Sequence, residues 1–324
     1  MTDSRQAVLL LAHGTPETVE QIPEYLRNVV SGRPLPQQVI EEIQHRYSLI
    51  GRSPLTEITL EQGRLVEAEL AAQGAAVPVY VGMRNWRPYI PDVVRQMRAD
   101  GIEEAAVICL APQNSRTSVG LYRRAVQAEA GTLRIDFTEG WAQHPLLADA
   151  FAGRLRTAIT KLSAETGEPV PVLFTAHSVP TRTVEPPSAA EAAGQPRLWP
   201  GEGADPYAEE ARHTAELVAA RVPEMSKWWF AFQSQGASGG PWIGPSVENT
   251  LETIAAEGVK TLILQPIGFL CDHVEILYDV DILFRGYAAK LGVRLERPES
   301  LNASATLAKA VADLARRGLA RLEN

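Results

Sequence analysis

Two histidines and one acidic segment have the residue types and spacing that could support chemistry. His13 and His177 each follow a short apolar run, and both stand in the pattern Ala-His-x-x-Pro, about half the chain apart. Apolar runs of this length, bounded by turn-forming residues, are typical of strands buried in a parallel sheet. Ligands of open α/β sheets bind beyond the carboxyl ends of such strands. A lone histidine there is more often structural, but its repetition favours a function for at least one of the two, with both facing one cleft.

The acidic segment lies at residues 266–284 and contains Asp272, Glu275 and Asp279. If the chain is helical from Asp272 onward, the three carboxylates share one face, because residues three and four apart are neighbours on a helix. Carboxylates placed together repel one another unless a cation or a proton relieves the repulsion. A solvated first turn favoured by the helix dipole is the alternative, but the segment follows a strand and is otherwise apolar. We therefore favour a functional row, which Leu283 continues with an apolar residue.

This combination of side chains suits metal or proton chemistry. Neutral imidazole and carboxylate are ligands for divalent transition metals, and both groups can transfer protons. The sequence has no His-x-x-x-His pair, so it does not predict a tightly held structural zinc. We expect His45 and His213 on solvated helix faces. The leading candidates are therefore His177 and Glu275, for a metal that passes through or for protons that must be moved.

The elements that must position these residues repeat along the chain. Strands are expected in two matching sets, at residues 7–16, 77–83 and 101–112 and at residues 171–180, 228–233 and 258–266. Helical periodicity lies between and after them, at residues 16–30, 60–73, 207–222 and 303–322. Strands that alternate with helices form right-handed βαβ units around a parallel sheet. The predicted fold is therefore α/β, with two Rossmann-like lobes that lack the glycine fingerprint and are related by an internal repeat.

We expect the first lobe at residues 1–150, the second lobe, which carries the acidic segment, at residues 151–300, and a C-terminal helix at residues 301–324 that packs back on the first lobe. The Pro-, Ala- and Gly-rich stretch at residues 181–205 is expected to be a loop that lines or covers the cleft, with a surface excursion as the alternative. The Gly- and Ser-rich loop at residues 233–246 could floor a flat aromatic site. It lacks the Lys-Ser/Thr ending of a phosphate loop.

Composition and charge exclude several classes of protein. The 324 residues are 45% hydrophobic, and 31 basic against 39 acidic side chains give a net charge of −8, which would repel nucleic acid. Cys109 and Cys271 cannot by themselves hold a four-cysteine iron–sulfur cluster, and we expect them to be free thiols in a reducing compartment. The N-terminal apolar run is too short for a signal peptide, and no stretch is long enough to span a membrane. We therefore expect a cytoplasmic protein.

The chain resembles the ferrochelatases along nearly its whole length. The resemblance is carried by LLAHGTP at residues 10–16, HRYSLIGRSPL at 45–55, GMRNWRP at 82–88, LAPQNS at 110–115, FTAHSVP at 174–180, DPY at 205–207, FQSQG and PWIGP between 232 and 245, and PIGFLCDHVEILYDVDI at 266–282. The motifs AHS-x-P and GF-x-x-DH-x-E-x-LYD-x-D are highly specific, and their order and spacing match as well.

The resemblance implies the chelatase fold, with a porphyrin in the cleft between the lobes, and a lyase that inserts ferrous iron with release of two protons. His177 and Glu275 would then handle the iron and accept the protons, with Asp272 and Asp279 as a further proton or metal relay. Iron is a substrate in this scheme, so no permanently bound cofactor and no iron–sulfur cluster is expected. The expected partners are the porphyrin and ferrous iron, and we expect a monomer.

Within the family, the chain is most similar to the short, cluster-free bacterial enzymes that act on coproporphyrin III, a porphyrin with four propionates. On that pattern the residues that contact the porphyrin or its propionates are His13, Arg46, Tyr47, Ser53 and Tyr122. His13 stands where those enzymes have a tyrosine that can ligate iron on the opposite face, so an axial ligand is retained with different chemistry.

Two further departures from the pattern concern the substrate and the acidic row. Val30 and Ser31 replace arginines, which leaves Arg33 and keeps open the choice between coproporphyrin III, giving coproheme, and protoporphyrin IX, giving protoheme. Leu283 replaces a carboxylate, which argues against an outer metal site. A chelatase for another metal or tetrapyrrole and a non-catalytic heme-binding protein also remain open at this point. The complete acidic segment disfavours the heme-binding protein, because heme storage does not need Glu275.

Overall fold

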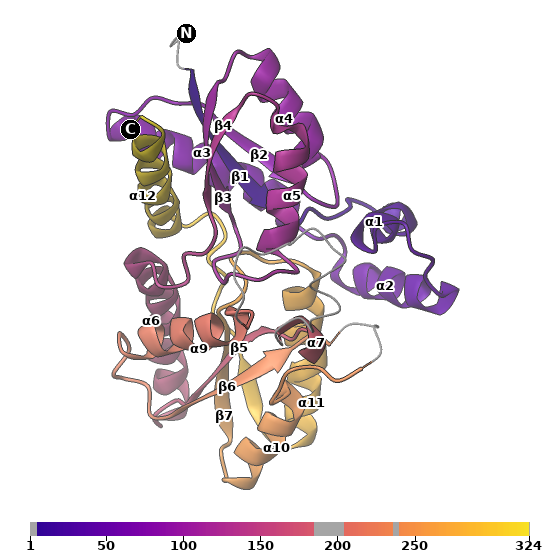
Figure 1. Ribbon diagram of the computed structural model, residues 1–324. Helices are drawn as coiled ribbons and strands as arrows, with labels where there is room; N and C mark the ends of the chain where they lie inside the picture. Colours follow the sequence, from indigo (N-terminus) through magenta and orange to yellow (C-terminus); the bar gives the residue numbers. More distant parts are fainter. Residues whose placement is uncertain (1–4, 185–203, 236–239, 324) are drawn as a thin grey trace.

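Two four-stranded parallel sheets form the centre of the protein. The computed structural model describes residues 5–184, 204–235 and 240–323 (Figure 1). The strand order is β2-β1-β3-β4 in the first sheet and β6-β5-β7-β8 in the second, and all paired strands run parallel. Because β1 to β4 and β5 to β8 follow the same order, the structure confirms the predicted fold of two α/β lobes related by a repeat.

The strands are β1 (Gln6–Ala12), β2 (Val79–Met83), β3 (Glu104–Cys109), β4 (Arg134–Thr138), β5 (Val172–His177), β6 (Trp228–Gln233), β7 (Thr261–Pro266) and β8 (Arg294–Glu296). All six predicted strands are present. The structure adds β4 and β8, which lie at the outer edge of their sheets. Both are short and carry charged residues, so they lack the apolar run that identified the others.

The helices of the first half are η1 (Val19–Gln21), α1 (Ile22–Val29), α2 (Gln37–Ile50), α3 (Leu55–Ala72), α4 (Ile90–Ala99) and α5 (Val119–Ala130). Those of the second half are α6 (Pro145–Thr166), α7 (Thr181–Val184), α9 (Tyr207–Ala219), α10 (Val247–Ala256), the π-helix η2 (Glu275–Phe284), α11 (Arg285–Lys290) and α12 (Ala305–Leu322). The four predicted helices correspond to η1 with α1, to α3, to α9 and to α12. Of the loop expected at residues 181–205, the first four residues form α7, and residues 185–203 lie outside the described residues.

Helices cover both faces of each sheet, which explains why the strands are apolar throughout. Along β1, Val8 and Leu10 join the apolar cluster that includes residues of α3 and α12, whereas Leu9 and Leu11 join the cluster that includes residues of α4 and α5. Figure 1 shows these two pairs of helices on opposite faces of the first sheet. The alternation follows from the two-residue period of a strand.

The two lobes share one core. The cluster on one side of the first sheet continues through α6 and α12 to one side of the second sheet, with Leu10 and Phe174 in the same cluster. The expected boundary at residues 150 and 151 falls inside α6, and α12 packs against α3, β3, β4 and α6. None of the described helices is both long and apolar enough to cross a membrane.

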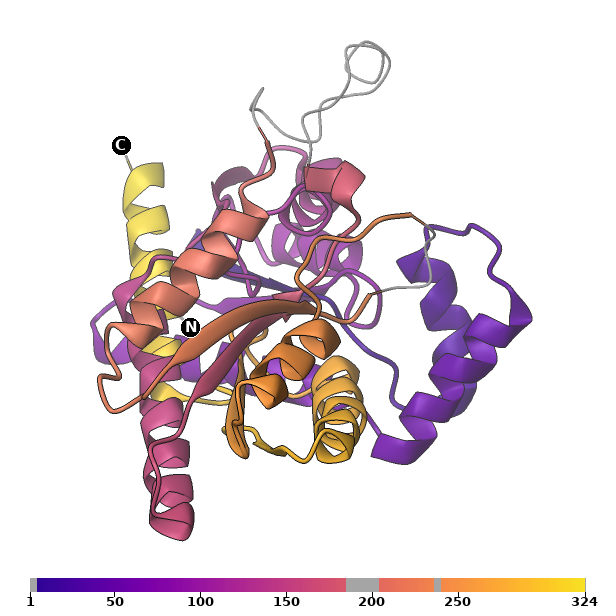
Figure 2. The same ribbon diagram turned by 90° about the horizontal axis from the view of Figure 1, so that it is seen from below.

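The helices α1 and α2 project from the first lobe beside the open end of the sheets (Figures 1 and 2). A small apolar cluster fixes them, formed by Ile22, Tyr25 and Leu26 of α1, Tyr47 of α2 and Trp86 from the segment after β2. Val274, directly before η2, packs against this cluster. The projection therefore connects the first lobe with the acidic segment of the second.

The close packing of α12 on β3 gives a prediction about Gly318. A Cβ atom built there lies 2.9 Å from Cβ of Ala106 and 3.0 Å from Oδ1 of Asp136, whereas one built at Gly153 of α6 meets nothing within 4 Å. Gly153→Ala should raise the free energy of unfolding by about 0.5–1 kcal/mol, because alanine costs less backbone entropy. Gly318→Ala should lower it by about 1–3 kcal/mol through overpacking. Urea unfolding of both variants measures the difference, and a gain in stability from Gly318→Ala would contradict the close approach.

Candidate active site

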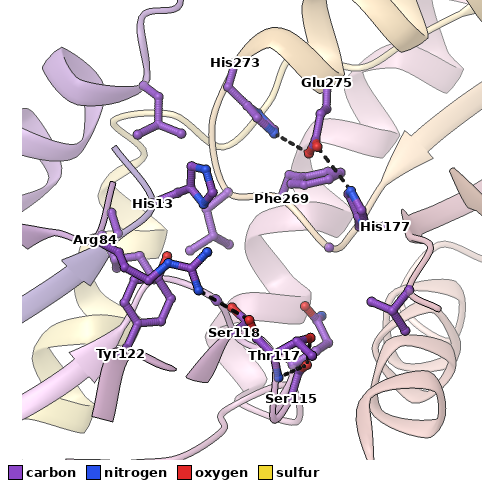
Figure 3. Close-up of a pocket in the computed structure, with 18 of the residues that line it drawn as sticks. His13, Arg84, Ser115, Thr117, Ser118, Tyr122, His177, Phe269, His273 and Glu275 are labelled. Atoms are coloured by element: carbon purple, nitrogen blue, oxygen red, sulfur yellow. Dashed lines mark hydrogen bonds and ion pairs between the residues drawn. The ribbon is translucent and has the colours of Figure 1, made fainter. Parts of the chain in front are cut away.

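A cavity of about 520 Å³ opens at the carboxyl ends of the strands and is lined by residues of both lobes. His13, directly after β1, and Tyr122 of α5 line it from the first lobe, and His177 at the end of β5 and Glu275 at the start of η2 line it from the second (Figure 3). The two histidines of the repeat therefore face one cavity, in the position where parallel α/β sheets bind ligands.

His177 and Glu275 form a pair across 98 residues of sequence. His177 Nε2 lies 3.1 Å from Oε1 of Glu275. The other ring nitrogen, Nδ1, makes a short hydrogen bond to the backbone carbonyl of Ser178. A carbonyl only accepts, so Nδ1 carries a proton and Nε2 is the nitrogen that gains or loses one. The nitrogen that titrates thus points at a carboxylate oxygen.

The electrostatics of this pair favour the charged forms. Burial, the largest single effect, lowers the pKa of His177, but the Glu275 charge and hydrogen bonds to Glu275 and Ser178 outweigh it and raise the pKa overall. For Glu275, burial acts to raise the pKa, and the charges and hydrogen bonds of His177 and His273 lower it well below its ordinary value. Each partner therefore stabilises the ionised form of the other.

His273 is a member of the site that the sequence reasoning did not single out. Its Nε2 lies 3.3 Å from Oε2 of Glu275, and its Nδ1 lies 3.0 Å from the carbonyl of Cys271, to which it donates. The ring packs against Phe269 with centroids 4.5 Å apart. Glu275 thus has an imidazole at each carboxylate oxygen. The signal was present, because His273 stands two residues before Glu275 in the most specific motif.

The pKa of His13 is shifted in the opposite direction from that of His177, its counterpart in the repeat. Its Nε2 lies 2.8 Å from the hydroxyl of Tyr25, and Nδ2 of Asn85 lies 3.2 Å from its Nδ1 and 3.1 Å from its Nε2. Burial, followed by the positive charge of Arg84, lowers the pKa of His13 to about 3. The ring is therefore neutral at neutral pH, with both nitrogens beside hydrogen-bonding groups.

Asp279 and Arg46 lie behind Glu275 and outside the cavity lining. Burial raises the pKa of Asp279 to about 6, against the effect of a hydrogen bond that Ser234 donates to its Oδ2. Arg46 of α2 places Nη1 3.5 Å from the other carboxylate oxygen of Asp279, and it also pairs with Glu42 and lies over the Tyr278 ring. In this arrangement Arg46 binds the protein's own carboxylates.

The prediction that Asp272 shares a helical face with Glu275 is wrong. η2 begins only at Glu275, and Asp272 lies in the turn before it. Its carboxylate accepts hydrogen bonds from Ser300 at 2.7 Å and Asn302 at 3.0 Å and pairs with Arg297 at 3.2 Å. The Asp272 carboxylate is therefore engaged by the segment before α12, and Asp272 does not line the cavity.

Among the other expected porphyrin contacts, only Tyr122 lines the cavity, where its ring lies under the guanidinium of Arg84. Tyr47 is 1% exposed within the cluster that holds α1 and α2, and Ser53 is 7% exposed. Neither lines the cavity, and neither hydroxyl has a hydrogen-bond partner among the described residues. Leu283 is 45% exposed on η2.

Cys109 and Cys271 are buried free thiols, as expected. Within residues 5–184, 204–235 and 240–323, no group of three or more His, Cys, Asp or Glu side chains is arranged to hold a metal ion. Loop residue Trp242 lines the cavity, and residues 236–239 of the same loop lie outside the described residues.

Comparison with known proteins identifies the family. The family model described as Ferrochelatase matches residues 5–319. A protein named Ferrochelatase from Acidobacterium capsulatum is 61% identical over 323 residues, which cover 99% of this chain and 97% of the relative. A protein named Coproporphyrin III ferrochelatase from Mycolicibacterium vanbaalenii is 36% identical over 320 residues, with coverage of 96% and 89%.

A solved structure with the same fold is the sirohydrochlorin chelatase SirB from Bacillus subtilis subspecies spizizenii in complex with cobalt. It has a TM-score of 0.56 at 10% identity and covers 98% of this chain and 97% of its own. At this identity the likeness concerns the fold alone, and it agrees with the two sheets described above. From the family model and the close relatives together, the chain belongs to the ferrochelatase family.

Proposed function

We propose that this protein inserts ferrous iron into coproporphyrin III to give coproheme in heme biosynthesis, and that His177 and Glu275 carry out the proton and metal handling. The observation that carries the proposal is the 3.1 Å pair between His177 Nε2 and Glu275 Oε1 at the cavity wall. Membership of the family supports iron insertion. The relatives named Coproporphyrin III ferrochelatase favour coproporphyrin III over protoporphyrin IX as the substrate.

The chemistry requires a base and an anion beside the macrocycle. A porphyrin releases two pyrrole protons as iron enters, so a group at its face must accept them. In its neutral form, His177 accepts a proton at Nε2, and Glu275 stabilises the imidazolium that results. Imidazole nitrogen and carboxylate oxygen are also ligands that ferrous iron accepts as it passes to the porphyrin. No resident cofactor takes part in these steps.

Protons must then leave this half-buried pair. The Nε2 atom of His273 contacts the second carboxylate oxygen of Glu275 and can exchange a proton with it. Asp279 lies on the far side, and its pKa of about 6 allows it to hold and release a proton near neutral pH. We propose the order His177, Glu275 and Asp279 for the outward path.

His13 is proposed to contact the porphyrin face opposite His177. A neutral imidazole can serve as an axial ligand of iron. To bind iron through Nε2, His13 must give up the contacts of that nitrogen with the hydroxyl of Tyr25 and the amide of Asn85.

The first prediction concerns turnover. Anaerobic assays with ferrous iron should yield metalloporphyrin from coproporphyrin III faster than from protoporphyrin IX. His177→Ala should lower kcat by about 10²–10⁴-fold, the range for loss of a positioned base, while porphyrin binding is retained. His213→Ala, on the outer face of α9, is the matched control. If the protein forms no metalloporphyrin from either substrate but binds hemin tightly, the enzymatic proposal fails, and a preference for protoporphyrin IX would correct the substrate.

The second prediction concerns pH. The pKa of His177 is raised above 6.5, so the imidazolium predominates at lower pH and the free base appears as pH rises through that value. Insertion should therefore increase with pH, with a midpoint above about 6.5. Glu275→Gln removes the charge that raises this pKa and leaves the burial that lowers it, so the midpoint should fall. A pH–rate profile measures the shift, with Glu299→Gln, a 62% exposed carboxylate, as control. An unmoved midpoint in Glu275→Gln would show that His177 is not the titrating base.

The third prediction concerns His13 and the porphyrin face opposite His177. His13→Ala should shift the absorption spectrum of bound ferric coproporphyrin III, because one candidate axial ligand is removed. Tyr25→Phe removes the hydroxyl beside Nε2 and should strengthen the ligation by His13. Identical spectra for all three proteins would show that His13 does not bind the iron.

A further inference from the structure

The cavity lining carries an excess of positive charge. Its described lining residues include three arginines, Arg33, Arg84 and Arg182, and one acidic residue, Glu275. Glu275 is already engaged by two imidazoles. None of the three arginines forms an ion pair with a carboxylate in the part of the chain that the structure describes. The chain as a whole carries a net charge of −8, so this local reversal of sign indicates an anionic ligand.

Arg84 is the most fixed of the three. It directly follows β2, its guanidinium lies over the Tyr122 ring at 5.4 Å, and Nη1 donates to the backbone carbonyl of Thr117 at 3.3 Å. These contacts orient the group without neutralising it, because an aromatic face and a carbonyl carry no full charge. A guanidinium has five N–H donors, and this is the only hydrogen bond that it makes to another residue among the described ones. Figure 3 shows Arg84 on the His13 side of the cavity, across from His177 and Glu275.

Arg182 and Arg33 reach the same cavity from other segments. Arg182 belongs to α7 of the second lobe, five residues after His177, and Arg33 lies between α1 and α2, where its Nε donates to the carbonyl of Val30 at 3.0 Å. Both side chains are exposed, as expected of groups at a cavity mouth. Cations from three separate segments around one cavity match a ligand with several separated carboxylates better than a ligand with one.

We propose that Arg84 and Arg182, one from each lobe, bind carboxylate groups of the macrocyclic substrate, with Arg33 as a third anion-binding residue. The inference rests on the proposed function and deepens it. It assigns a tetracarboxylate porphyrin to the cavity, because four propionates offer a partner to each arginine while two do not. Arg84 and Arg182 thereby determine substrate specificity at positions separate from the proton-accepting pair.

Porphyrin binding without iron tests the proposal independently of insertion. Fluorescence quenching gives Kd for coproporphyrin III, protoporphyrin IX and octaethylporphyrin, which carry four, two and no carboxylates. Arg84→Gln and Arg182→Gln should each weaken coproporphyrin III binding roughly tenfold, as expected for loss of a charge-assisted hydrogen bond. The double variant should lose roughly a hundredfold, since well-separated sites add. Octaethylporphyrin binding should change by less than about twofold.

Arg87→Gln is the matched control, because Arg87 lies three residues from Arg84, is exposed, pairs with Glu24 and does not line the cavity. Coproporphyrin III affinities of Arg84→Gln and Arg182→Gln equal to that of Arg87→Gln would overturn the proposal, as would an equal loss of octaethylporphyrin binding. The two proposals fail differently. A wild-type protein that inserts iron but shows no arginine dependence refutes only the carboxylate assignment. One that binds coproporphyrin III through these arginines and inserts no iron refutes only the enzymatic function.

Discussion

The half-buried contact between His177 and Glu275 makes a strong demand on the surrounding structure. Two opposite charges partly removed from water are costly unless geometry and hydrogen bonds compensate. The carbonyl of Ser178 and the ring of His273 supply part of this compensation. Gln233, the last residue of β6, donates its side-chain amide to the backbone carbonyl of Glu275 at 3.3 Å. The ends of two neighbouring strands thus hold the start of η2.

The chain must also turn sharply to bring Glu275 to the end of β5. The backbone of Ile267 donates to Thr175 at 2.8 Å, and a Cβ at Gly268 would lie 3.2 Å from Ala176. Glycine at this position lets the segment after β7 pass against β5. Arg297 stabilises the turn that follows. It donates two hydrogen bonds, of 2.9 and 2.8 Å, to the carboxylate of Asp281 and also pairs with Asp272.

This network gives Asp272 a different role from the one that its spacing indicated. Its backbone N–H donates to the side chain of Asn302 at 2.9 Å, and Asn302 donates its own N–H to Leu270. The residues on both sides of the His273–Glu275 pair are thereby attached to the segment that leads into α12. Asp272 holds the turn, so the motif that reads as a row of three acids has Glu275 at the cavity wall, Asp279 outside the lining and Asp272 in the turn.

How much the sequence could reveal differs between the strands and the acidic segment. The central strands were predictable because burial on both faces demands an uninterrupted apolar run, as in β1 and β5. The edge strands β4 and β8 have no such demand, and three of the five residues of β4, RIDFT, are polar. The phase of η2 was not predictable from an α-helical period, because a π-helix bonds residues five apart. The contact of Arg46 with Asp279 joins residues 233 positions apart, and no local pattern reports it.

The repeat also placed two histidines at equivalent strand ends, but only their neighbours in three dimensions give them different chemistry. At His177, burial lowers the pKa but the Glu275 carboxylate beside the ring outweighs it, whereas at His13 burial, followed by the cation Arg84, lowers the pKa to about 3. One wall of the cavity therefore carries the more basic imidazole, and the other stays neutral at the ring and positive beside it. In the binding mode proposed above, a flat ligand has its centre between the two histidines, with one face toward each, and its carboxylate-bearing rim meets arginines from both lobes. His13 and His177 are thus residues of the same type at equivalent positions, and their different proton affinities follow from their different surroundings.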